Sequence, residues 1–203
     1  MSYVDRYLTE ASEILQGLDA AAVERLVGLL ADVQTGRGRL FVLGVGGGAG
    51  HASHAVADFR KLTGIEAYSP ADNISELTAR INDEGWKTAY GNWLEVSHLG
   101  PGDMVLVFSV GGGDLERNVS ANLVFALEYA KNVGATVCGV VGRDGGFTAK
   151  VADACVIVPT VNSDTVTAHT ESFQALVWHL LVSHPKLRRT RMRWESLTVP
   201  EQT

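Results

Sequence analysis

Five short apolar runs, separated by segments long enough for a helix, constrain this chain more than any other feature of its sequence. They are rich in β-branched and aromatic residues and hardly alternate between apolar and polar positions, as is typical of strands buried on both faces of a parallel sheet. The runs are LFVLG from residue 40, IEAY from 65, MVLVFSV from 104, ATVCGVV from 135 and ACVIVP from 154. The segments between them supply the crossover helices that parallel strands need. The sequence therefore predicts an α/β fold with a doubly wound sheet.

Helical spacing of apolar residues marks both ends of the predicted domain. Residues 1–35 contain two such segments, with Gly17 and Asp19 between them, and predict an N-terminal helical hairpin. A further helix over 169–183 is expected to close an α/β core that spans 36–185. A chain of 203 residues with 46% hydrophobic residues can fill one good-sized core, so we expect a single domain over 1–185.

Charge and hydropathy exclude several classes of partner. The formal net charge of -6 argues against a surface for duplex nucleic acid, which needs clustered cations. A local basic tail, residues 186–203, is expected to be a solvated segment or a subunit contact; its cations are Lys186, Arg188, Arg189, Arg191 and Arg193. No apolar run is long enough to cross a bilayer and the start has no signal-peptide pattern, so the expected location is cytoplasmic, without a membrane partner.

Two glycine-rich loops follow predicted strands. The first, in LGVGGGAGHASHAVADF at 43–59, matches the GxGxxA pattern of dinucleotide-binding folds. That fold wants an acid at the end of its second strand, whereas Glu66 lies inside the IEAY run. The second loop, in FSVGGGDLERNV, faces the same edge of the sheet, and two loops suit a compact ligand gripped from both sides. No nucleotide cofactor is therefore expected.

Polar residues gather at helical spacing behind the first loop. His51, His54 and Asp58 share one helix face, where they are either zinc ligands or ordinary solvated groups. On the closing helix, Glu171 and Gln174 also share a face, and His169 precedes them; a helix-capping role for Thr170 and Glu171 competes with a role in the site. His179, between Trp178 and Leu180, is interpreted as a core histidine.

From residue 3 to 184 the chain resembles the sugar isomerase (SIS) domain family, and specifically its phosphoheptose isomerase branch. Family members carry GNGGSAADAQHFAAEL where this sequence has GVGGGAGHASHAVADF at 44–59, and STSGNS where it has SVGGGD at 109–114. GVVGRDGG at 139–146 agrees as well. The resemblance implies a three-layer, flavodoxin-like sandwich with a five-stranded parallel sheet, and a homotetramer with active sites at subunit interfaces. It also implies conversion of sedoheptulose 7-phosphate, a small sugar phosphate, to the aldose.

The resemblance assigns roles to individual residues. His54 falls on a zinc-binding histidine, and Asp58 on the glutamate that serves as general base, one methylene shorter. Glu171 falls on a glutamine near the metal, so that His54, Asp58 and Glu171 form the expected metal set. Gln174 falls on the catalytic histidine. Because a glutamine cannot exchange a proton near neutral pH, that position would lose its acid/base function.

The implied phosphate pocket lacks most of its hydroxyl groups. They are replaced by Gly48, Gly111 and Asp114, which leaves Ser109, and Asp114 would repel a phosphate unless a cation or an arginine intervened. The expected substrate-binding residues are Gly46, Gly47, Gly48, Ser109, Gly111, Gly112, Gly113 and Asp114.

Two hypotheses about function follow. In the first, the chain is an aldose-ketose isomerase with Asp58 or Glu171 as base, Glu171 or His169 as acid, and zinc polarising the carbonyl. In the second, it is a non-catalytic SIS module that binds a sugar derivative or a protein partner. The altered residue Gln174 and the missing phosphate hydroxyls favour this alternative.

Overall fold

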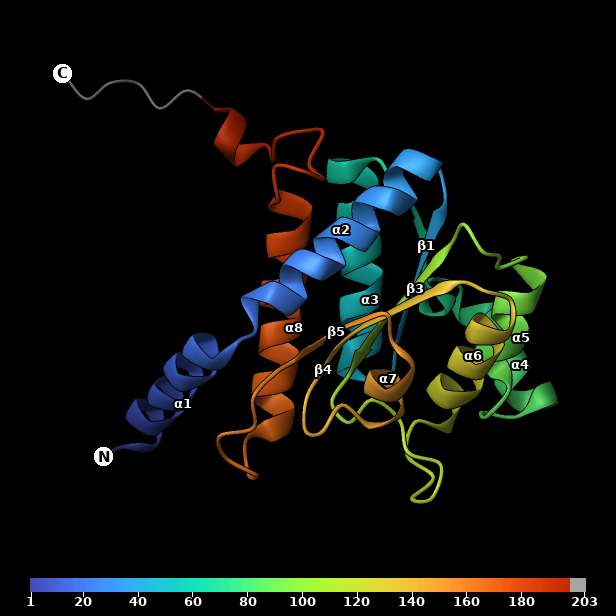
Figure 1. The fold of residues 1–203 in the computed structure, drawn as a ribbon. Helices are drawn as coiled ribbons and strands as arrows, with labels where there is room; N and C mark the ends of the chain where they lie inside the picture. Colours follow the sequence, from blue (N-terminus) through green and yellow to red (C-terminus); the bar gives the residue numbers. More distant parts are fainter. Residues whose placement is uncertain (198–203) are drawn as a thin grey trace.

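A five-stranded, entirely parallel sheet forms the middle layer of the computed structural model, which describes residues 1–197 (Figure 1). The strands lie in the order β2-β1-β3-β4-β5. Their bounds are β1 (Arg39–Gly44), β2 (Glu66–Tyr68), β3 (Met104–Ser109), β4 (Thr136–Val141) and β5 (Ala154–Ile157). The α/β class, the parallel sheet and its five strands are confirmed. The strand order reverses between β1 and β3, so the loops after these two strands flank the position where open α/β sheets bind ligands.

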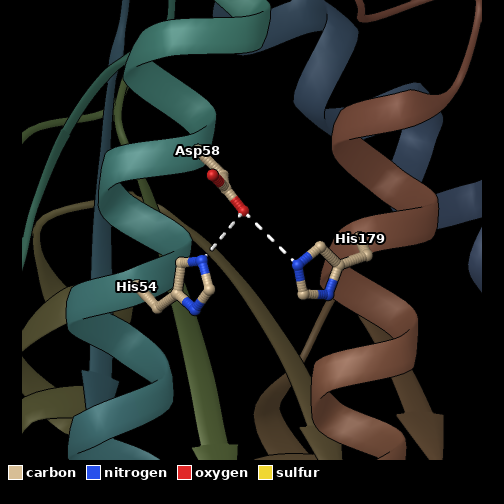
Figure 2. A group of neighbouring side chains, drawn as sticks. All are labelled: His54, Asp58 and His179. Carbon is tan, nitrogen blue, oxygen red and sulfur yellow. Dashed lines mark ion pairs between the residues drawn. The ribbon is translucent and has the colours of Figure 1, made fainter. Parts of the chain in front are cut away.

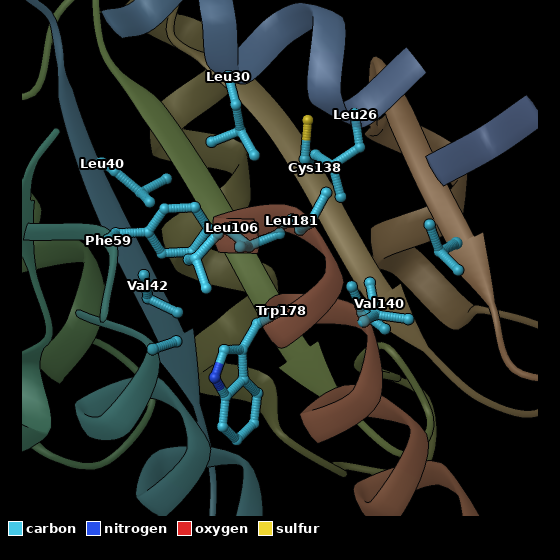
Figure 3. Packing of buried hydrophobic residues seen from close by; sticks show 14 of the residues in the cluster. Leu26, Leu30, Leu40, Val42, Phe59, Leu106, Cys138, Val140, Trp178 and Leu181 are labelled. Carbon is cyan, nitrogen blue, oxygen red and sulfur yellow. The ribbon is translucent and has the colours of Figure 1, made fainter. Parts of the chain in front are cut away.

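Two hydrophobic layers cover the sheet because successive side chains of a strand point to opposite faces. In β3, Leu106 and Phe108 face the first layer and Val105 and Val107 face the second. The first layer, part of which Figure 3 shows, also contains Trp178. Its helices are α2 (Ala20–Gly36), α3 (Gly47–Asp58) and α8 (Val166–Ser183). The second layer is formed by α4 (Ile74–Glu84), α5 (Ala89–Val96), α6 (Ala121–Asn132) and α7 (Gly146–Val151).

Several boundaries differ from the sequence-based expectation. α8 begins at Val166, so Thr170 and Glu171 lie inside the helix and do not cap it. α6 begins only at Ala121, because residues 114–119 form an excursion closed by an antiparallel bridge between Asp114 and Val119. α3 continues into a π-helical turn, η1 (Phe59–Thr63). The remaining short elements are the 3-10 turns η2 (Pro70–Asp72) and η3 (Trp194–Ser196).

The N-terminal helices are present, but they are arranged in an extended way. α1 (Tyr3–Gly17) starts with a capping box in which Ser2 and Asp5 bond to each other's backbone amides. Figure 1 shows α1 running on from α2 and away from the sheet instead of folding back beside it. Only Glu10 and Ile14 of α1 are buried. Most of this helix is therefore exposed in the single chain.

The start of the predicted basic tail packs on the domain. Leu187 is only 1% exposed, and the amides of Arg189 and Thr190 both donate to the carbonyl oxygen of Leu62 in η1, at 2.8 and 3.1 Å. The ordered domain thus extends beyond 185, to residue 190. Residues 198–203 of the predicted tail lie outside the described residues. Within residues 1–197, no helix is both long and apolar enough to cross a membrane.

Candidate functional site

The candidate site lies along the line where α3 and α8 pack side by side in the same direction; we call the exposed side of this helix pair the groove. Both helices begin at the carboxyl edge of the sheet, and their residues meet in chain order: Gly47 with Glu171, His54 with Trp178, and Asp58 with His179. Because the pairs keep this order, a row of polar side chains follows the groove away from the first glycine loop.

Three of these side chains converge at one point of the groove. Figure 2 shows His54 and Asp58 on α3 pointing toward His179 on α8. Each histidine places Nε2 3.6 Å from Oδ2 of Asp58, and one ligand atom of each residue lies within 4.8 Å of the others. The i, i+4 spacing puts His54 and Asp58 on one helix face, as the sequence predicts. We call His54, Asp58 and His179 the open triad, because both imidazoles are about half exposed.

The hydrogen bonds of His179 favour a cation in the open triad. Its Nδ1 lies 2.8 Å from the carbonyl oxygen of Ala175, which can only accept, so Nδ1 carries a proton. In a neutral ring, Nε2 then carries a lone pair that faces the Asp58 carboxylate. The same carboxylate also accepts a hydrogen bond from Trp178 Nε1 at 3.3 Å. Two acceptors face each other only if a proton or a metal ion lies between them. A ring nitrogen that donates to a carbonyl while the other stays free is the usual state of a metal-binding histidine.

The donor set of the open triad fits zinc. Imidazole nitrogen and carboxylate oxygen are ordinary zinc ligands, and two ligands of a tetrahedral zinc ion lie about 3.3 Å apart. The observed separations of 3.6 Å are close to that value. Three protein ligands on a solvent-facing groove leave a fourth position for water or substrate.

The predicted metal set therefore changes in one member. Glu171 precedes His179 by eight residues, or about 12 Å along the helix axis, and does not belong to the open triad. His179 takes its place. The expectation that His179 is a core histidine is wrong, since its side chain is 46% exposed and faces Asp58. Its neighbour Trp178 is a core residue. One helical step of about 100° separates the two, which places His179 at the rim of the buried face.

Gln174 and His169, two predicted catalytic residues, lie elsewhere. Gln174 is fully buried and donates from Nε2 to the carbonyl oxygen of Val140, so its side chain faces the sheet. His169 is 3% exposed and lies about 15 Å along α8 from His179. The structure thus corrects the reading of Gln174 as the position that faces the base: the α8 residue opposite Asp58 is a histidine, His179.

His169 belongs instead to a second polar group, the Glu10 cluster, which joins α1 to the start of α8. Oε2 of Glu10 lies 3.0 Å from His169 Nε2 and accepts from Thr165 Oγ1 at 2.8 Å, while Oε1 accepts from Asn162 Nδ2 at 2.6 Å. The ring of His169 stacks on Tyr7 at 4.2 Å. The hydrogen bond from Asn162, followed by that from Thr165, lowers the pKa of Glu10 to about 2. The Glu10 cluster therefore stabilises the packing of α1 against the start of α8.

The first glycine loop packs tightly against its neighbours. A side chain at Gly48 would collide with the carbonyl oxygen of Phe108, and one at Gly47 would collide with the Glu171 carboxylate. Glu171 therefore lies on the first turn of α3, in the space that a Cβ atom at position 47 would occupy. His51 follows one turn later, and its pKa is lowered by burial, an effect that the negative charge of Glu171 partly offsets.

The second glycine loop keeps one buried hydroxyl group, and a second hydroxyl group lies directly before α6. Ser109 Oγ accepts from the amide of Gly112 at 3.0 Å. Asp114 pairs with Arg117 at 2.8 Å inside the excursion, so the arginine that the sequence analysis required is present. The residue directly before α6 is Ser120, at φ 50°. Sequence reasoning missed it because the excursion 114–119 shifts the start of the helix.

Comparisons with known proteins agree with this architecture. No family model matches the chain. It is 34% identical over 195 residues to the lincomycin biosynthesis protein LmbN of Streptomyces lincolnensis, a match that covers 91% of this chain and 69% of that protein. It is 30% identical over 191 residues to a phosphoheptose isomerase of Paramagnetospirillum magneticum, with 89% and 92% covered.

Solved structures show the same fold. Phosphoheptose isomerase GmhA from Neisseria gonorrhoeae superposes with a TM-score of 0.76 at 24% identity, over 88% of this chain and 94% of that one. A phosphoheptose isomerase from Francisella tularensis gives 0.72 at 18% identity, over 90% and 97%.

Proposed function

The chain belongs to the phosphoheptose isomerase family of SIS-domain proteins, and we propose that it converts sedoheptulose 7-phosphate, or a related ketose phosphate, into the aldose. The observation that carries this proposal is the open triad, in which a carboxylate faces a histidine across a solvent-accessible groove. This arrangement supplies the base and the acid that an aldose-ketose isomerisation needs.

The reaction moves one proton between neighbouring carbons. A base breaks the C1–H bond of the ketose while the oxygen on C2 gains a proton, which gives an enediol. The same proton, or one from water, then forms the C2–H bond while the oxygen on C1 loses its proton and becomes the aldehyde. C1 is oxidised and C2 is reduced by the same electron pair, so no external oxidant or reductant is needed.

In our proposal Asp58 takes the carbon-bound proton, and Nε2 of His179 exchanges a proton with the substrate oxygens. Trp178 donates to Oδ2 of Asp58 and holds the carboxylate in the groove. His54, Asp58 and His179 are also the residues that would hold zinc. With zinc bound, Nε2 of His179 would be a ligand and would not exchange a proton; the metal would then polarise the carbonyl in its place, and the free oxygen of Asp58 would still take the carbon-bound proton. Glu171 and His169 do not act as the acid, because neither faces Asp58.

The second glycine loop is the proposed phosphate site. The amides of Gly111 and Gly113 and the start of α6 supply N–H groups, and Ser120 supplies a hydroxyl directly before the helix. Arg143 lies over Gly111 and has no acidic partner within ion-pair distance among residues 1–197. Gly113 packs against Val124 in the first turn of α6, which brings the loop and the helix together.

We also propose a homotetramer with sites at subunit interfaces. α1 stands away from its own domain and exposes an apolar stripe that includes Val4, Leu8 and Leu15, each more than half exposed. A second subunit is the partner that we propose for this stripe, since exposed stripes of this kind mark association surfaces. Light scattering on the purified protein, compared with a Leu8→Asp variant, tests it: the variant should dissociate.

The decisive experiment is an isomerase assay with sedoheptulose 7-phosphate, run with and without added zinc and read by product chromatography. Turnover that disappears in Asp58→Asn, but persists in Asp32→Asn on the exposed side of α2, supports the proposal; Asp32→Asn makes the same charge change away from the groove. No turnover in either condition contradicts it. Sugar binding without turnover would then favour the non-catalytic SIS module.

A further inference from the structure

Glu171 lies where an anionic ligand would be expected to bind. Its carboxylate packs on Gly47, in the first turn of α3, and this helix N-terminus carries the partial positive charge that attracts phosphate groups. The carboxylate therefore already supplies a negative charge to the helix. A phosphate at the same place would meet a like charge at close range, which costs binding free energy.

The backbone of the first loop points to the same conclusion. The amides of Gly48 and Ala49 donate to the carbonyl oxygens of Val45 and Gly46, at 3.1 and 3.0 Å, and Gly50 also donates to Gly46. The loop thus consumes most of the N–H groups that a phosphate cradle needs. Gly46 and Gly47 keep the exposed amides of the loop, and Glu171 lies directly on the second of them.

The second loop has the opposite character. Asp114, at the end of the loop, is paired with Arg117, and Arg143 lies over Gly111 without an acidic partner among residues 1–197. The two loops flank one ligand position but differ in charge. One presents a carboxylate and the other presents a cation.

We infer that Glu171 is a specificity-determining residue, which closes the first glycine loop to anions and accepts hydroxyl groups of the substrate there. The inference rests on the proposed function for the identity of the substrate as a sugar phosphate. It fixes the orientation of that substrate: the phosphate enters at the second loop, and the polyol chain runs past Glu171 and His51 toward the open triad.

Inorganic phosphate and the Glu171→Gln variant test the inference without any need for turnover. The variant keeps the shape of the side chain and removes its charge. Phosphate is titrated into the ¹⁵N-labelled full-length protein while amide shifts are followed. In the wild type, we expect shifts at Gly111 and Gly113 but not at Gly46 and Gly47. In Glu171→Gln, the first-loop amides should respond, with phosphate affinity at that loop raised at least about tenfold.

Two control variants separate local charge from other effects. Glu171→Asp keeps the charge and should keep the first loop closed, whereas Glu128→Gln makes the same change of net charge on the exposed side of α6 and should behave as the wild type. The inference is overturned if phosphate shifts Gly46 and Gly47 equally in the wild type and in Glu171→Gln. It is overturned also if those amides shift in neither protein. An inactive protein with the expected shifts would refute the isomerase and leave this inference standing.

Discussion

The Glu10 cluster and the open triad each pair a carboxylate with a histidine of α8, but only in the Glu10 cluster are the hydrogen bonds of the carboxylate short and complete. In the Glu10 cluster the carboxylate of α1 has partners at 2.6 to 3.0 Å on both oxygens, lies against the start of α8 and is almost inaccessible to water. In the open triad, the carboxylate is 3.6 Å from both histidines, which are half exposed. A group with short, complete bonds holds elements together. A solvent-accessible group whose members lie farther apart is available for chemistry.

The largest expected effect comes from removing the carboxylate of the open triad. Asp58→Asn should lower kcat/KM for sedoheptulose 7-phosphate by about 10³-fold or more, because it removes the base and a metal ligand together. Its melting temperature should stay close to that of the wild type. Steady-state kinetics and calorimetry on the same preparation check both halves; a folded variant with unchanged kcat/KM contradicts the assignment.

Zinc should stabilise only a protein with an intact open triad. At a free zinc concentration about 100-fold above the Kd, binding adds about 2.7 kcal/mol to the free energy of unfolding. This corresponds to about 5 to 10 °C in a domain of this size. His179→Ala should lose the shift, and His98→Ala, a histidine outside the groove, should keep it. Equal shifts in the two variants would place the ion elsewhere.

For the Glu10 cluster we expect a loss of stability without a loss of turnover. Glu10→Gln replaces a carboxylate that accepts from three side chains with an amide that has only one acceptor oxygen, so the melting temperature should fall by a few degrees. The kcat should remain close to the wild-type value, because the cluster lies more than two helical turns from His179. Thermal melts and kinetics distinguish these outcomes; a variant that keeps its stability and loses turnover would reverse the roles of the two groups.

A smaller effect is expected from acid. The pKa of Glu10 is lowered from its ordinary value of 4.5 to about 2, chiefly by the hydrogen bond from Asn162. The stabilisation it gives is complete above pH 4.5 and is lost as the pH falls toward 2. Between these values, the melting temperature of the wild type should therefore fall more steeply than that of Glu10→Gln. Parallel curves would show that the carboxylate is not held in its charged form.

The sequence predicted the scaffold well because burial leaves a strong periodic signal. The five apolar runs became the five strands, and the i, i+4 pair of His54 and Asp58 became half of the open triad. The errors lie where one helix packs against another. Periodicity could not decide whether Gln174 or His179 faces α3, since that depends on the rotation of α8, which Trp178 fixes by filling the core.

The prediction for the second loop was wrong for a different reason. The match of SVGGGD at 109–114 to the family pattern put Asp114 in the phosphate pocket, whereas Asp114 begins the excursion 114–119 and α6 starts only at Ala121. No periodic signal marks such an insertion. The extended course of α1 was equally hidden, because its apolar stripe would suit a hairpin or a second subunit, and only the three-dimensional arrangement shows that its own domain leaves it exposed.

The hydrogen bonds from the amides of Arg189 and Thr190 to the carbonyl oxygen of Leu62 restrict the relative motion of α3 and α8. They tie the segment after α8 to η1, the continuation of α3, while Glu171 packs on Gly47 at the other end of the same two helices. Because contacts join α3 and α8 at both ends, they oppose a hinge motion that would separate the two helices. Their amides should therefore exchange with deuterium as one cooperative unit, slowly and together, and a groove of this kind admits its ligand through rotamer changes of exposed side chains rather than through a hinge.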